Sequence, residues 1–316
     1  MSQLNYKPEG FVRKITGGLT LAALEKARTE GQILEARVIM CDSDHNLIVD
    51  LGGIRGLIPR EEAALGIREG EVKDIAVLSR VNKHVCFKVT DLVRCKTLLP
   101  GTEEGSDPGF LALLSRRAAQ EQALDYMLSF YRKGDVVDAK VTHLESFGAF
   151  ADIGCGIVGL ISIENISVSR ISHPRDRFVQ GQNIKVVLKD IDYILRRFTL
   201  SHKELLGTWQ ENADRFRIGQ TVCGVVRSVE DYGIFVELAP NLAGLAESRE
   251  GVEPGQQATV YIKNIIPEKM KIKLSLIDCF EGGGRSESRY FIETGHLDRF
   301  VYSPPAASRC VETIFT

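Results

Sequence analysis

The sequence predicts all-β modules with helical linkers, in the form of three tandem five-stranded barrels. Two barrels are visible as an internal repeat, in which residues 134–160 match residues 219–245 at a constant offset of 85. The offset falls to 74 where Gly181 matches Gly255, so the later copy lacks the 11 residues (85 − 74) of one loop. A repeated unit of about 60–70 residues, rich in short Val and Ile strands, is a domain rather than one turn of a solenoid.

Each strong copy contains five short apolar stretches with the alternation that is typical of β-strands. In the earlier copy these stretches are 136–144, 148–153, 157–161, 184–191 and 198–201, and Gly154 and Gly156 form a turn. A long segment separates the third stretch from the fourth. Five strands in about 70 residues, with Gly at the corners, favour a small closed Greek-key barrel of the OB type.

A weaker third copy lies upstream of the other two. Gly31 and Gly56 match Gly134 and Gly159 at an offset of 103 residues. The segment 45–48 (His-Asn-Leu-Ile) stands where Phe-Gly-Ala-Phe stands in the second copy. The first copy therefore keeps the framework of the barrel but changes its surface.

The predicted order of segments follows from these copies. It consists of an N-terminal arm with a short helix at 1–30, a degenerate barrel at 31–92, a helical linker at 93–132, barrels at 133–205 and 218–278, and a flexible aromatic tail at 279–316. The short helix is expected to end at Gly31, and the linker helix to run from Asp107-Pro108 to about Tyr131, because Pro is favoured at the first helical position. Arg116, Arg117, Glu121 and Asp125 are expected to form its solvated side. Two alternatives stay open for the tail, which can dock on the third barrel or on a partner.

Composition excludes several classes of protein. No stretch approaches 18 apolar residues, so no membrane span is predicted. The first ten residues lack the features of a secretion signal. The seven cysteines are scattered and contain no Cys-x-x-Cys pair, which indicates reduced thiols in the cytoplasm and no metal site.

An enzyme is not predicted. The sequence contains no Gly-rich phosphate loop, no His/Cys cluster with metal-ligand spacing and no nucleophile elbow, so we assign no catalytic residue and no cofactor. His143, His173 and His202 surround the second barrel without carboxylates at diagnostic spacings. We expect these histidines to be solvent-exposed or to contact RNA.

The repeated aromatic cluster is the main indication of function. Phe147 and Phe150 in the second copy correspond to Tyr232 and Phe235 in the third. Core packing is the alternative, but a core position rarely varies among Phe, Tyr and, as at His45, His. Surface rings that stack on bases are therefore predicted, with Gly148 permitting a kink or bulge between the first two rings. A net charge of −2 argues against binding by bulk charge alone, while it remains compatible with stacking.

The motifs resemble the S1 RNA-binding domain, the repeated OB-fold unit of the bacterial small-subunit ribosomal protein S1 family. The similarity is carried by Gly134-x-x-Val137-x-Ala139-x-Val141, Ser146-Phe147-Gly148-Ala149-Phe150, Gly159-Leu160-Ile161-Ser162, Ile191-Asp192 and Arg197-x-x-Leu200-Ser201. It covers about 31–92, 133–205 and 218–278, and is strongest in the last two ranges.

The resemblance implies an RNA face of two aromatic residues, a His, an Asp and an Arg. In the second barrel these positions are Phe147, Phe150, Ser162 in place of His, Asp192 and Arg197; in the third they are Tyr232, Phe235, Glu247, Ile266 and Lys271. In the first barrel Pro59 stands at the His position and both aromatic residues are absent. Tight RNA binding is therefore expected of the second barrel, weaker binding of the third and little of the first.

Basic residues support the same ranking. Arg196, Lys140 and Lys185 lie beside the predicted face and could neutralise phosphates, although an Arg pair also decorates many ordinary hairpins. The second barrel has 10 Lys and Arg against 9 Asp and Glu over 133–205, and the third has 6 against 8 over 218–278. The second barrel is thus predicted to be the better RNA binder.

The predicted function is binding of single-stranded RNA, such as mRNA, to assist translation on the small ribosomal subunit in the cytoplasm. The resemblance implies that the degenerate first barrel, within residues 1–105, makes ribosome or protein contacts. Two alternatives stay open. One is an RNA-binding adaptor or nuclease cofactor in RNA turnover, and the other is a protein-interaction adaptor that uses the barrel aromatics as hot spots.

Overall fold

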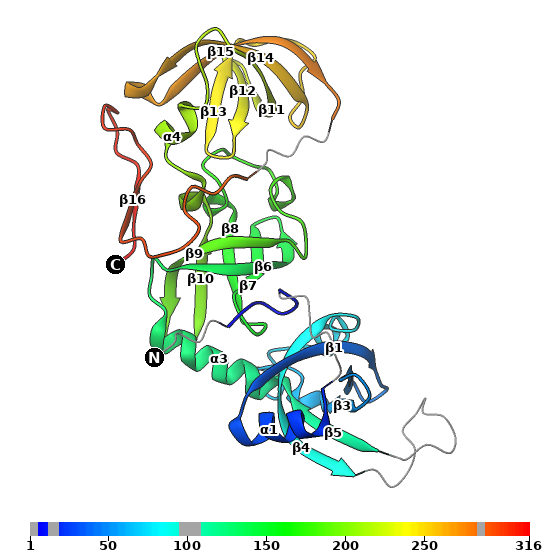
Figure 1. The fold of residues 1–316 in the computed structure, drawn as a ribbon. Helices are drawn as coiled ribbons and strands as arrows, with labels where there is room; N and C mark the ends of the chain where they lie inside the picture. The colour runs from blue at the N-terminus through cyan, green and yellow to red at the C-terminus, as the bar shows by residue number, and fades with distance from the viewer. Residues whose placement is uncertain (1–5, 12–18, 95–108, 283–287) are drawn as a thin grey trace. The chain divides into compact units, whose positions relative to one another are not determined.

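The computed structural model describes residues 6–11, 19–94, 109–282 and 288–316 (Figure 1). Three closed five-stranded barrels dominate these residues. The chain divides into two compact units, one of residues 1–130 with 152–157 and the other of residues 131–151 with 158–316. The predicted class of three tandem OB-type barrels with few helices is confirmed.

The first barrel follows a short helix. Helix α1 spans Leu21–Glu30, and the hydroxyl of Thr20 caps it by accepting a hydrogen bond from the backbone N–H of Ala23. Gly31 ends the helix in the left-handed conformation (φ 63°), as the sequence predicts. The barrel contains β1 (Ile33–Cys41), β2 (Leu47–Asp50), β3 (Arg55–Ile58), β4 (His84–Arg94) and β5 (Phe110–Ser115) in the spatial order β1-β2-β3-β5-β4, with the short helix α2 (Asp74–Leu78) before β4.

The expected end of this barrel at residue 92 is wrong, because its closing strand β5 comes later in the chain. Residues 110–115 pair in antiparallel register with β4 and in parallel register with β3. The side chain of Leu114 is buried in the barrel. The expected helix from Asp107-Pro108 would have included this residue. Residues 95–108 lie outside the described residues. Helix α3 therefore begins at Arg116 and ends at Phe130.

Arg116 does not lie on a solvated face of α3. Its side chain is 3% exposed, and its Nε and Nη2 atoms donate to the Glu9 carboxylate at 2.7 and 2.9 Å. Burial alone would raise the pKa of Glu9, but the guanidinium of Arg116 holds that pKa below its ordinary value. The buried Asp152 carboxylate accepts from the Glu9 backbone N–H at 2.8 Å, and burial and the negative charge of Glu9 raise the pKa of Asp152 to about 7. Residues 6–11 are thus held by a buried network, whereas the rest of the predicted arm, 1–5 and 12–18, lies outside the described residues.

The second and third barrels share one topology. The second barrel contains β6 (Val136–Glu145), β7 (Gly148–Asp152), β8 (Val158–Ser162), β9 (Asn183–Asp192) and β10 (Arg197–Ser201). The third contains β11 (Thr221–Glu230), β12 (Gly233–Ala239), β13 (Leu242–Ala246), β14 (Gln257–Ile266) and β15 (Lys271–Phe280). In each, the last strand pairs in parallel with the third and in antiparallel with the fourth. Helix α4 (Trp209–Ala213) stands between the two barrels in sequence, and the capping box of Thr208 and Glu211 begins it.

One glycine recurs at the same place in all three barrels, because the backbone of the third strand approaches a leucine of the fifth. A Cβ atom added to Gly56, Gly159 or Gly244 would lie 2.4, 2.7 or 2.6 Å from a Cδ1 atom of Leu114, Leu200 or Leu274, respectively. All three leucines are buried. This shared contact explains why the framework repeats even where the surface residues differ.

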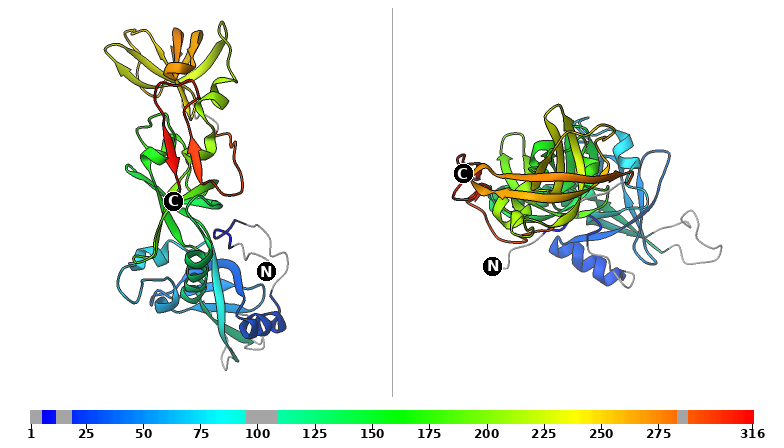
Figure 2. Two further views of the ribbon diagram at one scale, coloured as in Figure 1. Left: turned by 90° about the vertical axis from the view of Figure 1, so that its left-hand side faces the viewer. Right: turned by 90° about the horizontal axis from the view of Figure 1, so that it is seen from above.

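The C-terminal segment is not a flexible tail over residues 288–316. Strands β16 (Arg299–Val301) and β17 (Glu312–Ile314) pair in antiparallel register and lie side by side in the left view of Figure 2. The side chains of Phe300, Tyr302 and Phe315 are buried in the core cluster that contains the third barrel. Of the two alternatives for this segment, docking on the third barrel is confirmed. Residues 283–287 of the expected Gly-rich linker lie outside the described residues.

Candidate nucleic-acid interface

The hairpin between β6 and β7 carries the predicted aromatic pair of the second barrel. Phe147 lies in the turn with 54% of its surface exposed, and the backbone N–H of Ile163 donates to its carbonyl at 2.9 Å. Phe150 is half-buried on β7. The two ring centroids lie 6.0 Å apart at an interplanar angle of 89°. Neither ring is sealed in the core, and the edge-to-face arrangement leaves the rings pointing their faces in different directions.

The third barrel repeats this arrangement at the hairpin between β11 and β12. Tyr232 is 69% exposed, Phe235 is half-buried, and their centroids lie 6.1 Å apart at 88°. We call Phe147 with Phe150, and Tyr232 with Phe235, the two ring pairs. Two copies with different residue types at the exposed position reach the same geometry, which indicates that the hairpin backbone sets it.

A close approach of two backbones explains the glycine inside each ring pair. A Cβ atom at Gly148 would lie 2.4 Å from the carbonyl oxygen of Ile161, and one at Gly233 would lie 2.4 Å from that of Ala246. Any larger residue would push β7 from β8, or β12 from β13. In the third barrel the bulge itself lies on the opposite strand, between Val226 and Ser228 of β11. The glycine thus serves close packing, and its neighbour strand supplies the irregularity.

His143 joins the ring pair of the second barrel. Its imidazole centroid lies 6.5 Å from the Phe150 centroid at an angle of 32°, and its Nε2 atom lies 2.6 Å from Oε1 of Glu145. The equivalent position in the third barrel is Ser228, which pairs directly with Phe235. Of the three histidines around this barrel, His202 is buried, so the expectation that it is solvent-exposed or contacts RNA is wrong; the histidine that lies beside the rings is His143. Comparing positions 143 and 228 at the repeat offset would have distinguished it.

Asp192 and Arg197 face each other across the hairpin that joins β9 and β10. The Asp192 carboxylate closes this turn, since its Oδ1 accepts from the backbone N–H groups of Ile194 and Leu195 at 2.9 and 2.8 Å. Arg197 is exposed, while Arg196 is half-buried with a left-handed backbone (φ 53°). Asp192 therefore has a structural role that is independent of any ligand.

The third barrel builds the same hairpin without the acidic residue. Ile266 pairs with Lys271 at the equivalent place, and Met270 has the left-handed φ of 49° that matches Arg196. The side chain of Lys271 is exposed. The turn thus keeps its backbone shape, while its charge changes from one acid and two arginines to a single exposed lysine at these positions.

The remaining predicted residues lie farther along the strands. Lys140 is half-buried and pairs with Asn183 where β6 meets β9, whereas the ring pair lies at the end of β6 that joins β7. Lys185 is in an ion pair with Asp138 at 2.7 Å. At the position where the resemblance implies His, Ser162 donates to Glu164 at 2.6 Å, and Glu247 of the third barrel pairs with Lys263 at 2.6 Å. The two residues that stand in place of the implied His, Ser162 and Glu247, thus make local polar contacts.

The first barrel has a polar turn instead of a ring pair. The Asp42 carboxylate accepts from the backbone N–H groups of Asp44 and Asn46 at 2.9 and 2.8 Å. Hydrogen bonds from the side chain and from the backbone N–H of Asn46 lower the pKa of Asp42, and the side chain has the larger effect. His45 adopts a left-handed φ of 63° in this turn. The hairpin is thus closed by local hydrogen bonds and presents no aromatic surface there.

Comparison with known protein families finds a match at the second barrel. The S1 RNA binding domain family matches residues 131–203, which contain the second barrel and its ring pair. The chain is therefore similar to the S1 RNA-binding domain family over residues 131–203. Its similarity to the bacterial ribosomal protein S1 family, predicted from the motifs, is also confirmed. Among the described residues, no helix has the length and apolar character needed to cross a bilayer.

The S1 similarity extends over most of the chain. The chain is 32% identical over 270 residues to the small ribosomal subunit protein bS1 of Staphylococcus aureus (strain COL), which covers 80% of this chain and 63% of that protein. It is 31% identical over 277 residues to bS1 of Leuconostoc lactis, covering 82% and 59%. The chain therefore spans less than two thirds of these relatives. A crystal structure of a multidomain protein with nucleic acid binding domains from Streptococcus pneumoniae covers 78% of this chain and 73% of its own, at 14% identity and a TM-score of 0.26.

Proposed function

We propose that this chain binds single-stranded RNA, such as mRNA, through the ring pairs of its second and third barrels, and that it assists translation on the small ribosomal subunit. The observation that carries the proposal is the exposed edge-to-face ring pair at the same hairpin of both barrels. The match of residues 131–203 to an RNA-binding family supports it.

Unpaired bases suit such a surface because every base has a π-face. Stacking on one aromatic side chain stabilises binding by about 1–3 kcal/mol per base and tolerates any sequence. A duplex hides these faces, so the ring pairs favour single strands. The net charge of −2 makes stacking rather than bulk charge the main source of affinity.

Basic side chains around the hairpins would contact the backbone of the strand. We propose Arg197, Arg196 and Lys140 as phosphate contacts in the second barrel and Lys271 in the third. Asp192 would act indirectly, because its carboxylate holds the turn that places Arg197. These contacts position the strand and add little sequence preference.

The test is fluorescence anisotropy with a labelled unstructured RNA. Replacing Phe147 and Phe150 together by Ala should weaken binding at least about 30-fold, since two stacked rings contribute roughly 2 kcal/mol or more. Phe130→Ala is a matched control, because Phe130 is an exposed aromatic residue at the end of α3 and belongs to neither ring pair. Unchanged affinity in the double variant would show that the rings do not carry RNA binding.

Attachment to the small ribosomal subunit is the second part of the proposal, through the N-terminal region that includes residues 1–105. A deletion ending at residue 105 would remove four strands of the first barrel and leave β5 behind, so the variant should begin at Tyr131. We expect this variant to lose co-sedimentation with ribosomes and to keep RNA binding in anisotropy. Equal pelleting of both chains would contradict the assignment, and a specific protein partner without ribosome pelleting would favour an adaptor. Cytoplasmic localisation follows from the same proposal.

A further inference from the structure

The C-terminal segment 288–316 returns from the third barrel to the second (Figure 1). The Tyr290 hydroxyl accepts from the backbone N–H of Lys185 at 3.1 Å, and the backbone N–H of Phe291 donates to the Leu205 carbonyl at 2.9 Å. Residues 295–297 then extend along the start of the second barrel. Here the N–H of Val136 donates to the Gly295 carbonyl at 3.0 Å, and the N–H of Leu297 donates to the Gly134 carbonyl at 2.9 Å. We call residues 288–316 the strap.

The later part of the strap packs on the third barrel and on the segment between the barrels. The hydroxyl of Tyr302 donates to the Asn241 carbonyl at 2.7 Å, and the Trp209 N–H donates to the Tyr302 carbonyl at 2.9 Å. One continuous cluster of buried side chains includes Val187 from the second barrel, Trp209 from α4, Val236 from the third barrel, and Phe300, Tyr302 and Phe315 from the strap. The strap thus shares a core with both barrels.

The second and third barrels also contact each other directly, and we call this contact region the seam. The buried Arg177 guanidinium pairs with Glu237 of β12, which also accepts from Nε of Arg227 at 2.8 Å. The Asn241 side chain accepts from the N–H of Val168 at 3.0 Å. The same amide donates to the Lys203 and Gly207 carbonyls at 2.7 and 2.8 Å. Buried charges and amides need such partners, so separating the barrels would leave these groups unsatisfied.

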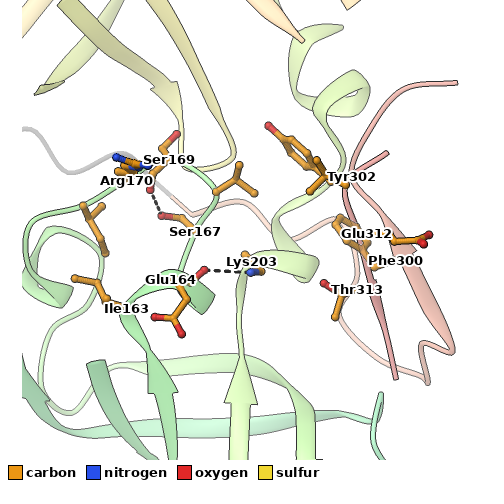
Figure 3. Close-up of a pocket in the computed structure, with 13 residues that line it drawn as sticks. Ile163, Glu164, Ser167, Ser169, Arg170, Lys203, Phe300, Tyr302, Glu312 and Thr313 are labelled. Carbon is orange, nitrogen blue, oxygen red and sulfur yellow. Dashed lines mark hydrogen bonds between the residues drawn. The ribbon is translucent and has the colours of Figure 1, made fainter. Parts of the chain in front are cut away.

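The strap bridges this seam rather than filling it. A cavity of about 400 Å³ lies between the loop after β8 and the strap (Figure 3). Ile163, Val168 and Lys203 line it from the second barrel, and Phe300 and Tyr302 line it from the strap. The strap therefore adds contacts at both of its ends to an interface that is not completely packed.

We propose that the strap is a positioning element for RNA binding, which fixes the third barrel on the second so that both ring pairs engage one continuous single strand. This inference rests on the proposed function. When two sites are held together, binding at the first makes binding at the second intramolecular, and the combined affinity can exceed either alone by about 10²–10⁴-fold. A loosened strap would lower this effective concentration without touching either ring pair. The preferred ligand is then a strand long enough to reach both barrels.

The experiment compares two RNAs on full-length chains by anisotropy. One is an oligouridylate of about 6 nucleotides, which suits a single barrel, and the other has about 24, since OB folds cover about 4–16 nucleotides each. The strap is weakened by Phe291→Ala with Phe315→Ala. These two rings are chosen because that of Phe291 packs against Gly207 and that of Phe315 is buried in the shared core. Ile314→Ala is the matched control, because Ile314 is the last residue of β17, directly precedes Phe315 in sequence and is 56% exposed.

We expect the double variant to bind the long RNA about tenfold more weakly and the short RNA as the unchanged chain does. Tyr290→Phe with Tyr302→Phe, which removes only two hydroxyl groups, should move the ratio of the two affinities in the same direction by a smaller factor. An unchanged ratio in both variants would overturn the positioning role. An equal loss on both RNAs would also overturn it, because it would show general damage to the barrels. If the unchanged chain binds neither RNA, the proposed function fails instead.

Discussion

The second and third barrels share a scaffold and a ring pair but differ in the side chains that surround the rings. Both hairpins need a glycine between the two ring-bearing residues, and both place the rings about 6 Å apart at nearly a right angle. Outside this constant centre, His143 is replaced by Ser228 and Asp192 by Ile266, and in the buried interior His202 is replaced by Leu276. The comparison indicates that backbone geometry sets where bases can stack, while the neighbours set how strongly each barrel binds.

The first barrel extends the comparison. It keeps the close contact between Gly56 and Leu114 that its counterparts have, yet its hairpin is closed by Asp42 and carries no ring pair. A barrel of this topology therefore does not require the rings for folding. The rings of the other two barrels are surface features added to a common framework, which supports a binding role for them.

The largest expected effect concerns the contact that joins the two barrels. Burial alone would raise the pKa of Glu237, but the guanidinium groups of Arg227 and Arg177 hold it below its ordinary value. Glu237→Gln removes the charge and leaves the buried Arg177 uncompensated, which should cost roughly 3–5 kcal/mol of unfolding free energy. Urea denaturation measures this cost, with the exposed Glu230→Gln on β11 as control. A change as small as that of the control would mean that the barrels fold independently of this pair.

A second prediction concerns the pH dependence of stability, to which His202 of the second barrel contributes and its counterpart Leu276 of the third does not. Burial lowers the pKa of His202 to about 4. Its Nδ1 atom lies 2.9 Å from the Ile166 carbonyl, which can only accept, so Nδ1 carries the proton and Nε2 accepts from the Tyr290 hydroxyl at 3.1 Å. The unfolded chain binds this proton near pH 6.5, so stability is full above 6.5 and falls as pH decreases toward 4. The loss through His202 amounts to about 3 kcal/mol.

The test of this prediction is His202→Leu, which installs the residue of the third barrel. The variant should be less stable at neutral pH, because the Ile166 carbonyl and the Tyr290 hydroxyl lose a partner, but it should lack the decline between pH 6.5 and 4. Denaturant midpoints across that pH range give the difference in stability between the variant and the unchanged chain. Other titrating groups, such as Asp152, are present in both chains and cancel in this difference. Parallel pH profiles would show that His202 is not the source.

Much of the fold was predictable because the repeat shows the same constraints twice. Positions 147 and 150 align with 232 and 235, so one hairpin geometry had to suit both ring pairs. The closing strand of the first barrel was missed because the offset breaks there, and the apolar run at 110–115 could equally begin a helix. The burial of Arg116 was hidden for a different reason, since its partner Glu9 is 107 residues away in sequence. Contacts at such separation leave no local pattern.

The candidate site was predictable for similar reasons only in part. Exposed rings follow from the variation among Phe, Tyr and His at one aligned position, but the place of His143 beside Phe150 depends on how β6 meets β7. The turn-closing role of Asp192 could not be read from the motif, because a family resemblance does not separate ligand contacts from backbone hydrogen bonds. The strap lacks periodicity, since its side chains fit a seam rather than one face of a regular element.

A third prediction ranks the ring pairs directly. With a short RNA, Phe147→Ala with Phe150→Ala should weaken binding more than Tyr232→Ala with Phe235→Ala, by roughly 1 kcal/mol or fivefold, because His143 extends the first surface by another ring. His143→Ser in the otherwise unchanged chain should bring the affinity of the second barrel close to that of the third. The opposite ranking in anisotropy would mean that the more exposed Tyr232 outweighs the additional imidazole.

The smallest expected effect concerns the basic side chains of two other hairpins, Arg197 between β9 and β10 and Lys271 between β14 and β15. Arg197→Ala and Lys271→Ala should each reduce the slope of log affinity against log salt by about 0.7, because each removes one phosphate contact to a single strand. Arg175→Ala, an exposed arginine in the loop after β8, should leave the slope unchanged. Arg197→Lys keeps the charge but loses the planar guanidinium. If it restores the slope yet not the affinity, Arg197 also stacks on a base, and the two hairpins then differ in kind and not only in strength.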